Sequence, residues 1–177
     1  MTPHLERHME RRHGRKLAIF DRDNTLTIDH TGYTTNVVDF AWLPGVLPAL
    51  GSMAKNGWRF AIATNQSGVG RGFYTLQSAR AFNEHLIRDA LLQGLHIEVS
   101  AICIHVPEDQ CECRKPKPGL ITALIDEFGG RLESVVVIGD KDSDVDAAVA
   151  AGVTGIKVAP GSMSSSLRYL MESNDLQ

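Results

Sequence analysis

Two aspartates separated by one residue, Asp21 and Asp23, follow a short apolar run at residues 17–20. An apolar run that stops at acidic residues is typical of a buried parallel strand whose C-terminal end carries carboxylates to a ligand site. Side chains at positions i and i+2 lie on the same side of an extended chain, so both carboxylates should face that site. Such a pair suits the binding of a hard cation and nucleophilic or acid–base chemistry beside it.

Two further apolar runs also end in residues that can do chemistry. Residues 58–63 lead into Thr64, and residues 135–138 lead into Asp140, with Asp144 close behind. A single aspartate after a strand is equally compatible with a helix cap. Three predicted strands that all end in such residues indicate one shared site. Strand ends of a doubly wound sheet converge in one crevice, and oxygen ligands of this kind favour Mg²⁺ over zinc.

The elements that must position these residues follow from the spacing of apolar side chains. Strands and helices alternate along the chain, which predicts an α/β fold with a doubly wound, mostly parallel sheet covered on both faces. We expect strands near 17–20, 58–63, 97–106, 135–138 and 155–158, and helices near 44–56, 76–92, 120–128, 144–151 and from 162. We interpret residues 27–42 as a flap, and residues 17–177 as a single capless domain.

Charge and composition limit the possible partners. A formal net charge of −3 gives no electrostatic reason to bind a nucleic-acid backbone, and no apolar run is long enough to span a membrane. Residues 1–16 are polar and lack the apolar core of a secretory signal, so we interpret them as a frayed leader. We expect a cytoplasmic monomer without nucleic-acid or membrane partners.

A second metal signature contains every cysteine of the chain and one histidine, namely Cys103, His105, Cys111 and Cys113. An odd number of cysteines speaks against a disulfide framework. Three thiols and one imidazole form a closed tetrahedral set for Zn²⁺ with no position left for water, so this zinc would be structural. The pinned loop would then fix the direction of Arg114 and Lys115, the expected positive partners of an anionic substrate.

Four segments resemble the motifs of the haloacid dehalogenase (HAD) superfamily of phosphotransferases, in the family's order. They are Asp21-Arg22-Asp23-Asn24-Thr25-Leu26, Thr64-Asn65-Gln66, Lys115 and Gly139-Asp140-Lys141-Asp142-Ser143-Asp144. The superfamily usually has Gly at position 24. Because Asn is the non-glycine residue that best tolerates a left-handed backbone, we expect the turn to persist.

The resemblance implies roles for six residues of these segments. Asp21 would be the nucleophile that forms an aspartyl-phosphate, and Asp23 would be the general acid and base. Thr64 and Lys115 would hold the transferring phosphoryl oxygens. It also implies that Mg²⁺ is bound by Asp21, the Asp23 carbonyl and Asp140, with Asp144 in support.

Two enzyme families of the superfamily are similar in their zinc cluster and in the Cys-Arg-Lys-Pro sequence at residues 113–116. They are the D-glycero-D-manno-heptose-1,7-bisphosphate 7-phosphatases and the histidinol-phosphate phosphatases. Residues 29–33 and 64–72 resemble segments of the heptose enzymes, with Thr31 inserted and Gly70 in place of the usual Ala. The compact C-x-H-x5-C-x-C spacing is shared with the histidinol enzymes. The resemblance implies substrate contacts at Asp29, His30, Gly32, Tyr33, Asn65, Gln66, Ser67, Arg71, Arg114 and Lys141.

Charge favours the sugar bisphosphate as substrate. A second phosphate would interact with extra cations such as Arg71, Arg114 and Lys141, which the chain offers. Histidinol phosphate carries an ammonium group and would need a carboxylate, for which Asp29 and Glu108 are available. More remote hypotheses are a nucleic-acid 3′-phosphatase, for which an aromatic and basic patch is missing, and a non-catalytic zinc-binding module, which would not need Asp21 and Asp23.

Overall fold

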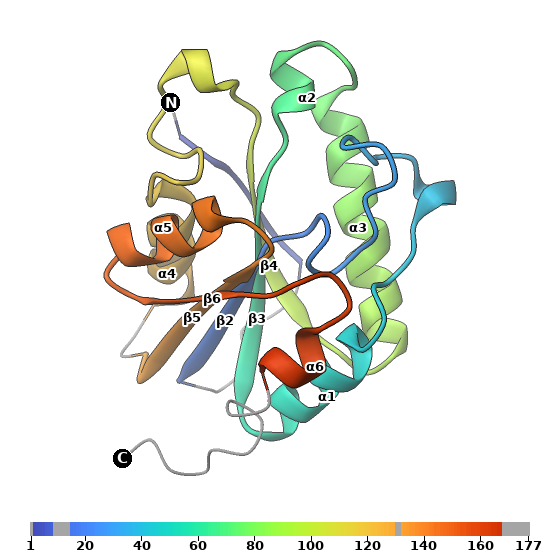
Figure 1. The fold of residues 1–177 in the computed structure, drawn as a ribbon, viewed down its shortest axis with the longest axis vertical. Coiled ribbons are helices and arrows are strands. Elements are labelled where there is room, and N and C mark those ends of the chain that lie inside the picture. Colours follow the sequence, from blue (N-terminus) through green and yellow to red (C-terminus); the bar gives the residue numbers. More distant parts are fainter. Residues whose placement is uncertain (1, 9–14, 130–131, 168–177) are drawn as a thin grey trace.

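The computed structural model describes residues 2–8, 15–129 and 132–167, and it contains one six-stranded sheet with the order β1-β4-β3-β2-β5-β6 (Figure 1). Strands β2 to β6 run parallel to one another, whereas β1 pairs antiparallel with β4. The strands are β1 His4–Arg7, β2 Lys16–Phe20, β3 Trp58–Asn65, β4 Ile97–Cys103, β5 Ser134–Gly139 and β6 Thr154–Lys157. The predicted mostly parallel α/β sheet is confirmed.

Helices cover both faces of this sheet. They are α1 Val46–Lys55, α2 Ser67–Gly70, α3 Leu76–Leu92, α4 Gly119–Phe128, α5 Asp142–Ala150 and α6 Met163–Ser166, with 3-10 turns η1 Val37–Asp39 and η2 Pro107–Asp109. Side chains of α1, α3 and α6 form one apolar core against the sheet. Those of α4 and α5 form a second core on the opposite face.

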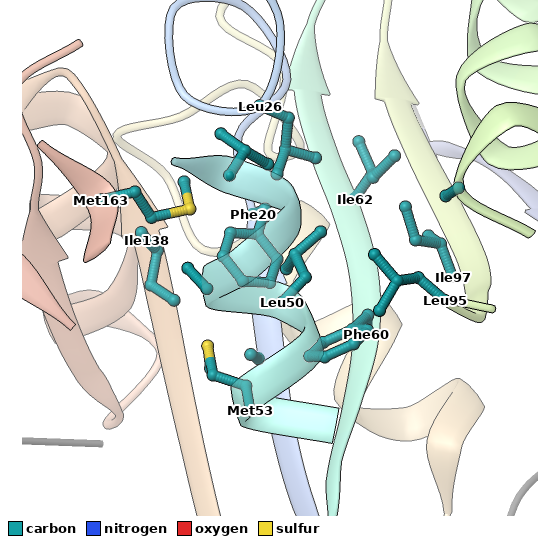
Figure 2. Packing of buried hydrophobic residues seen from close by; sticks show 14 of the residues in the cluster. Phe20, Leu26, Leu50, Met53, Phe60, Ile62, Leu95, Ile97, Ile138 and Met163 are labelled. Carbon is teal, nitrogen blue, oxygen red and sulfur yellow. The ribbon is translucent and has the colours of Figure 1, made fainter. Parts of the chain in front are cut away.

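The central strand β2 contributes alternate side chains to the two cores. Ala18 and Phe20 belong to the first core, while Leu17 and Ile19 belong to the second. Figure 2 shows Phe20 in the first core with the α1 side chains Leu50 and Met53 close by. This burial on both faces explains why the strand is continuously apolar until the chain reaches the sheet edge.

The segment that carries the two aspartates is anchored immediately after them. Leu26 is fully buried in the first core and lies above Phe20 in Figure 2. The turn between strand and anchor is closed by hydrogen bonds from the Asn24 amide to the Thr27 carbonyl (2.7 Å) and from the Leu26 amide to the Arg22 carbonyl (2.9 Å). Asn24 adopts a φ of 60°, the left-handed conformation expected for it.

Two local expectations were wrong. Residues 4–7 of the expected leader form β1, whose residues pair with Val99 through Ile102 of β4, because the sheet edge offers free backbone groups to an extended polar segment. Residues 67–70, which lie in none of the expected strands or helices, form the short helix α2. In the described part of the chain, no helix is both long and apolar enough to cross a membrane.

Candidate active site

The carboxyl ends of the central strands border a cavity of about 410 Å³. Most of the residues expected at the site line this cavity: Asp21, Asp23, Asp29, Gly32, Tyr33, Asn65, Gln66, Ser67, Arg114, Lys115, Lys141 and Asp144. Four do not contribute to the lining. Thr64 is buried beneath it, Asp140 lies beside Asp21, and His30 and Arg71 are exposed side chains outside it.

Lys115 is buried among carboxylates at one end of the cavity. Its Nζ donates hydrogen bonds to Asp21 Oδ1 (2.8 Å) and to the Ala63 carbonyl (2.7 Å), and it lies 2.6 Å from Asp144 Oδ1. Burial alone would lower the pKa of Lys115, but the charges of the two carboxylates outweigh it and raise the pKa. Burial raises the pKa of Asp21 to about 7, with Lys115 opposing the shift.

The amide of Asn65 holds the backbone of Lys115 in place. Asn65 Nδ2 donates to the Lys115 carbonyl (3.0 Å), and Asn65 Oδ1 accepts from the Lys115 amide (3.2 Å). Because both the nitrogen and the oxygen of the Asn65 amide bind the Lys115 backbone, Asn65 fixes the direction in which the Lys115 side chain points.

Three carboxylates come close enough together to hold one cation. Oxygens of Asp21, Asp140 and Asp144 all lie within 4.8 Å of one another. Within the described residues, Asp140 Oδ1 is buried without a hydrogen-bond partner. Both oxygens of Asp144 are occupied, Oδ1 by Lys115 and Oδ2 by the Lys141 amide at 3.0 Å. A hard cation on the Asp21 and Asp140 side would satisfy the orphaned oxygen.

The four residues of the second cluster lie at the end of β4 and in the loop that leads to α4. Cys103 Sγ is 3.7 Å from Cys111 Sγ and 3.5 Å from His105 Nδ1, while Cys113 Sγ is 3.6 Å from Cys111 Sγ and 3.3 Å from His105 Nδ1. All three thiols are buried. Four mutually close N and S ligands form the set that tetrahedral Zn²⁺ prefers.

The loop at residues 29–34 is held together by Asp29. Its Oδ1 accepts hydrogen bonds from Thr34 Oγ1 (2.8 Å), the Thr34 amide (3.1 Å) and the Thr31 amide (3.4 Å). Burial alone would raise the pKa of Asp29, but these hydrogen bonds outweigh it and lower the pKa. One oxygen of this carboxylate is therefore committed to shaping the loop that presents Gly32 and Tyr33 to the cavity.

Comparison with known proteins agrees with this geometry. A HAD-hydrolase-like family model matches residues 112–174. The D-glycero-β-D-manno-heptose-1,7-bisphosphate 7-phosphatase of Pseudomonas putida is 36% identical over 146 residues, which cover 82% of this chain and 83% of that protein. The enzyme of the same name from Helicobacter pylori J99 is 39% identical over 140 residues, covering 78% and 79%. The chain belongs to the heptose-bisphosphate phosphatase family of HAD hydrolases.

Solved structures place the fold in the same family. The D,D-heptose 1,7-bisphosphate phosphatase of B. bronchiseptica, complexed with magnesium and phosphate, is 31% identical, with a TM-score of 0.76 and 86% of each chain covered. The structure of a HAD-like protein of Mesorhizobium loti has a TM-score of 0.81 at 24% identity and covers 99% of this chain and 97% of that chain, which supports the fold alone.

Five residues at or behind this HAD site were missed by the sequence reasoning. Tyr74, Pro107, Pro116 and Ser143 line the cavity, and Arg22 is fully buried behind Asp23. Ser143 and Arg22 lie inside recognised motifs, so their positions were a usable signal. Nothing in the spacing indicated Tyr74, because its place depends on the turn after α2, in which the Phe73 amide donates to the Gly68 carbonyl (2.8 Å).

Proposed function

We propose that this protein is a magnesium-dependent phosphatase that removes the 7-phosphate from D-glycero-D-manno-heptose 1,7-bisphosphate. The observation that carries the proposal is the cluster of Asp21, Asp140 and Asp144 around Lys115 at the end of the cavity. It supplies a nucleophile, a cation site and a fixed positive charge within a few ångströms, which is the equipment that phosphoryl transfer needs.

The reaction proceeds in two steps on this chain's own residues. An oxygen of Asp21 attacks phosphorus, the bond from phosphorus to the sugar oxygen breaks, and Asp23 gives that oxygen its proton. Water then attacks the aspartyl-phosphate while Asp23 takes up the water proton, releasing phosphate and restoring the Asp21 carboxylate. Lys115 stabilises the charge on the phosphoryl oxygens, and the family resemblance gives the buried Thr64 hydroxyl the same role.

Asp21 and Asp140, with the Asp23 carbonyl, would hold Mg²⁺, and Asp144 would support them from behind. The bound cation would supply positive charge that offsets the charge of the phosphoryl group. The buried, unpartnered Asp140 Oδ1 and the magnesium and phosphate in the B. bronchiseptica relative both support this assignment. Cys103, His105, Cys111 and Cys113 would hold a structural Zn²⁺ that orders the loop before Lys115.

The cavity favours a substrate with a second phosphate over histidinol phosphate. Arg114 and Lys141 line it and add two positive charges beyond Lys115. Of the two carboxylates available to an ammonium group, Asp29 is committed to its own loop through Oδ1, and Glu108 is exposed and outside the lining. A small phosphorylated sugar is therefore the proposed substrate.

Phosphate release from three substrates tests the proposal. The purified protein with Mg²⁺ should hydrolyse heptose 1,7-bisphosphate with a kcat/KM well above that for histidinol phosphate or p-nitrophenyl phosphate. Asp21→Asn should remove turnover of all three, while Asp142→Asn, an exposed aspartate paired with Lys157, serves as the matched control. A preference for histidinol phosphate would overturn the substrate, and substantial turnover by Asp21→Asn would overturn the mechanism.

A further inference from the structure

The carboxylate of Asp23 is held on both of its oxygens. Arg22 donates from Nε to Oδ1 (2.9 Å) and from Nη2 to Oδ2 (3.0 Å), and Gln66 Nε2 donates to Oδ2 (2.7 Å). The Asp23 side chain retains 16% exposure and lines the cavity. A general acid must meet its proton partner within hydrogen-bond reach, so these bonds determine whether Asp23 points correctly.

Arg22 is anchored in the protein interior. Its side chain is fully buried, its Nη1 donates to Asn83 Oδ1 (3.1 Å), and its Nη2 also donates to the Thr34 carbonyl (3.2 Å). The guanidinium carbon lies 4.6 Å from the centre of the Phe82 ring. Because α3 holds the Arg22 guanidinium on one side and the 29–34 loop holds it on the other, Arg22 cannot follow a displaced Asp23.

The hydrogen bond from Gln66 to Asp23 depends on the orientation of the Gln66 side-chain amide. Gln66 Nε2 donates to Asp23 Oδ2 and to Thr64 Oγ1 (2.8 Å), and Gln66 Oε1 accepts from the Tyr74 hydroxyl at 2.6 Å. The ionised Asp23 carboxylate, the form that takes up the water proton, can only accept, so the amide nitrogen must face Asp23 and the amide oxygen must face away. The Tyr74 hydroxyl is the donor that meets that oxygen, and it favours this orientation over the flipped one.

We propose that Tyr74 is a positioning residue: its hydroxyl fixes the amide of Gln66, and Gln66 with Arg22 fixes the Asp23 carboxylate for proton transfer. The inference rests on the proposed function, because it concerns the residue that protonates the leaving oxygen. Tyr74 lines the cavity, but its hydroxyl hydrogen is directed at Gln66. It therefore acts through the amide and not by binding substrate.

Leaving-group dependence tests this role. Protonation matters most for esters of poorly acidic alcohols and hardly at all for p-nitrophenyl phosphate, whose phenolate leaves unaided. With general acid catalysis worth roughly 10²- to 10⁴-fold, partial misplacement in Tyr74→Phe should lower kcat/KM by about 10-fold for small alkyl phosphates and less than about 2-fold for p-nitrophenyl phosphate. Trp42→Phe, which removes a 2.6 Å hydrogen bond from Trp42 Nε1 to Asp89 of α3 outside the cavity lining, should leave the dependence on leaving-group pKa unchanged.

Two further measurements separate the inference from its rivals. If Tyr74 acts through Gln66, Tyr74→Phe should cost nothing more in a Gln66→Leu background. An equal loss for all esters would indicate a general structural effect, and a loss confined to heptose bisphosphate would indicate a substrate contact; either overturns the inference while the phosphatase function stands. A neutron crystal structure of Tyr74→Phe, which locates the amide hydrogens, decides the matter independently of turnover: an Asp23 carboxylate still bound to Gln66 Nε2 overturns the inference, and a flipped amide supports it.

Discussion

Lys115 and Asp21 are 94 positions apart in the sequence, yet Lys115 Nζ lies 2.8 Å from Asp21 Oδ1. The ammonium group also contacts Asp144 and the Ala63 carbonyl, while Asn65 holds the backbone of the same residue. Both ends of the lysine are thus fixed in the absence of substrate. A charge fixed in this way can stabilise a transition state without reorganisation at the moment of reaction.

Removing this charge should affect stability as well as turnover. In Lys115→Met, the buried carboxylates of Asp21 and Asp144 lose their partner, which costs roughly 3–5 kcal/mol for a broken buried pair. We expect that loss in urea unfolding without added Mg²⁺, and partial recovery when Mg²⁺ is added. The control is Lys117→Met, whose partially exposed pair with Glu112 should contribute less than about 1 kcal/mol. Equal unfolding free energies for the two variants would contradict this account.

The cysteine cluster makes a prediction about metal content. The purified protein should contain one Zn²⁺ per chain, and His105→Gln should lose it because one of the four ligands is missing. Arg114 Nη1 donates to the His105 carbonyl (3.3 Å), and Arg114 lines the cavity. The loss of zinc should therefore also disorder the Arg114 side chain and lower turnover. Elemental analysis and phosphate release measure the two effects. His85→Gln, outside the cluster, should keep the metal; zinc-free wild-type protein would refute the assignment.

Gly68 and Gly51 offer a matched pair of glycine substitutions. A Cβ at Gly68 would lie 2.2 Å from Tyr74 Cε1 and 2.9 Å from Tyr33 Cδ1, so Gly68→Ala should displace both rings and lower turnover. A Cβ at Gly51, in the middle of α1, meets nothing within 4 Å. Gly51→Ala should therefore stabilise the fold by about 0.5–1 kcal/mol without changing turnover. Thermal unfolding and phosphate release of both variants check this, and unchanged activity of Gly68→Ala would contradict it.

The order of the loop at residues 29–34 should depend on the ionisation of the Asp29 carboxylate at low pH. Its folded pKa lies below the ordinary value of 3.8, so its contribution to loop order is complete above that value and is lost as pH falls through the folded pKa. The Thr34 amide resonance should titrate with a midpoint below 3.8. Asp29→Asn should remove this titration, and a midpoint above 3.8 would show that the hydrogen bonds do not favour the charged form.

The parts of the fold that periodicity predicts are those whose burial is regular. The bounds of α3 were predicted correctly because its apolar stripe runs unbroken between the cap at Thr75 and Gly94. The edge strand β1 was missed, since its residues alternate between intermediate and exposed and only Leu5 among them is apolar. The helix α2 was missed because two of its four residues are glycine, which predicts a loop.

The candidate site divides in the same way. The convergence of Asp21 and Asp140 was predictable, because strand ends of a parallel sheet meet at one edge. The arrangement of Arg22 and Gln66 around Asp23 was not, because a charged residue between two aspartates gives no sign that it will be fully buried. Hydrogen bonds of this kind depend on side-chain rotamers, which no spacing rule describes.

The antiparallel strand β1 has a practical consequence for handling the protein. It occupies the outer hydrogen-bonding edge of β4, a strand whose residues are buried along its whole length and whose last residue is Cys103. A version that starts after residue 8 would uncover the backbone edge of a buried strand, which is a template for intermolecular pairing and aggregation. An N-terminal affinity tag that disrupts the pairing of β1 with β4 would have the same effect, so a purification tag belongs at the C-terminus.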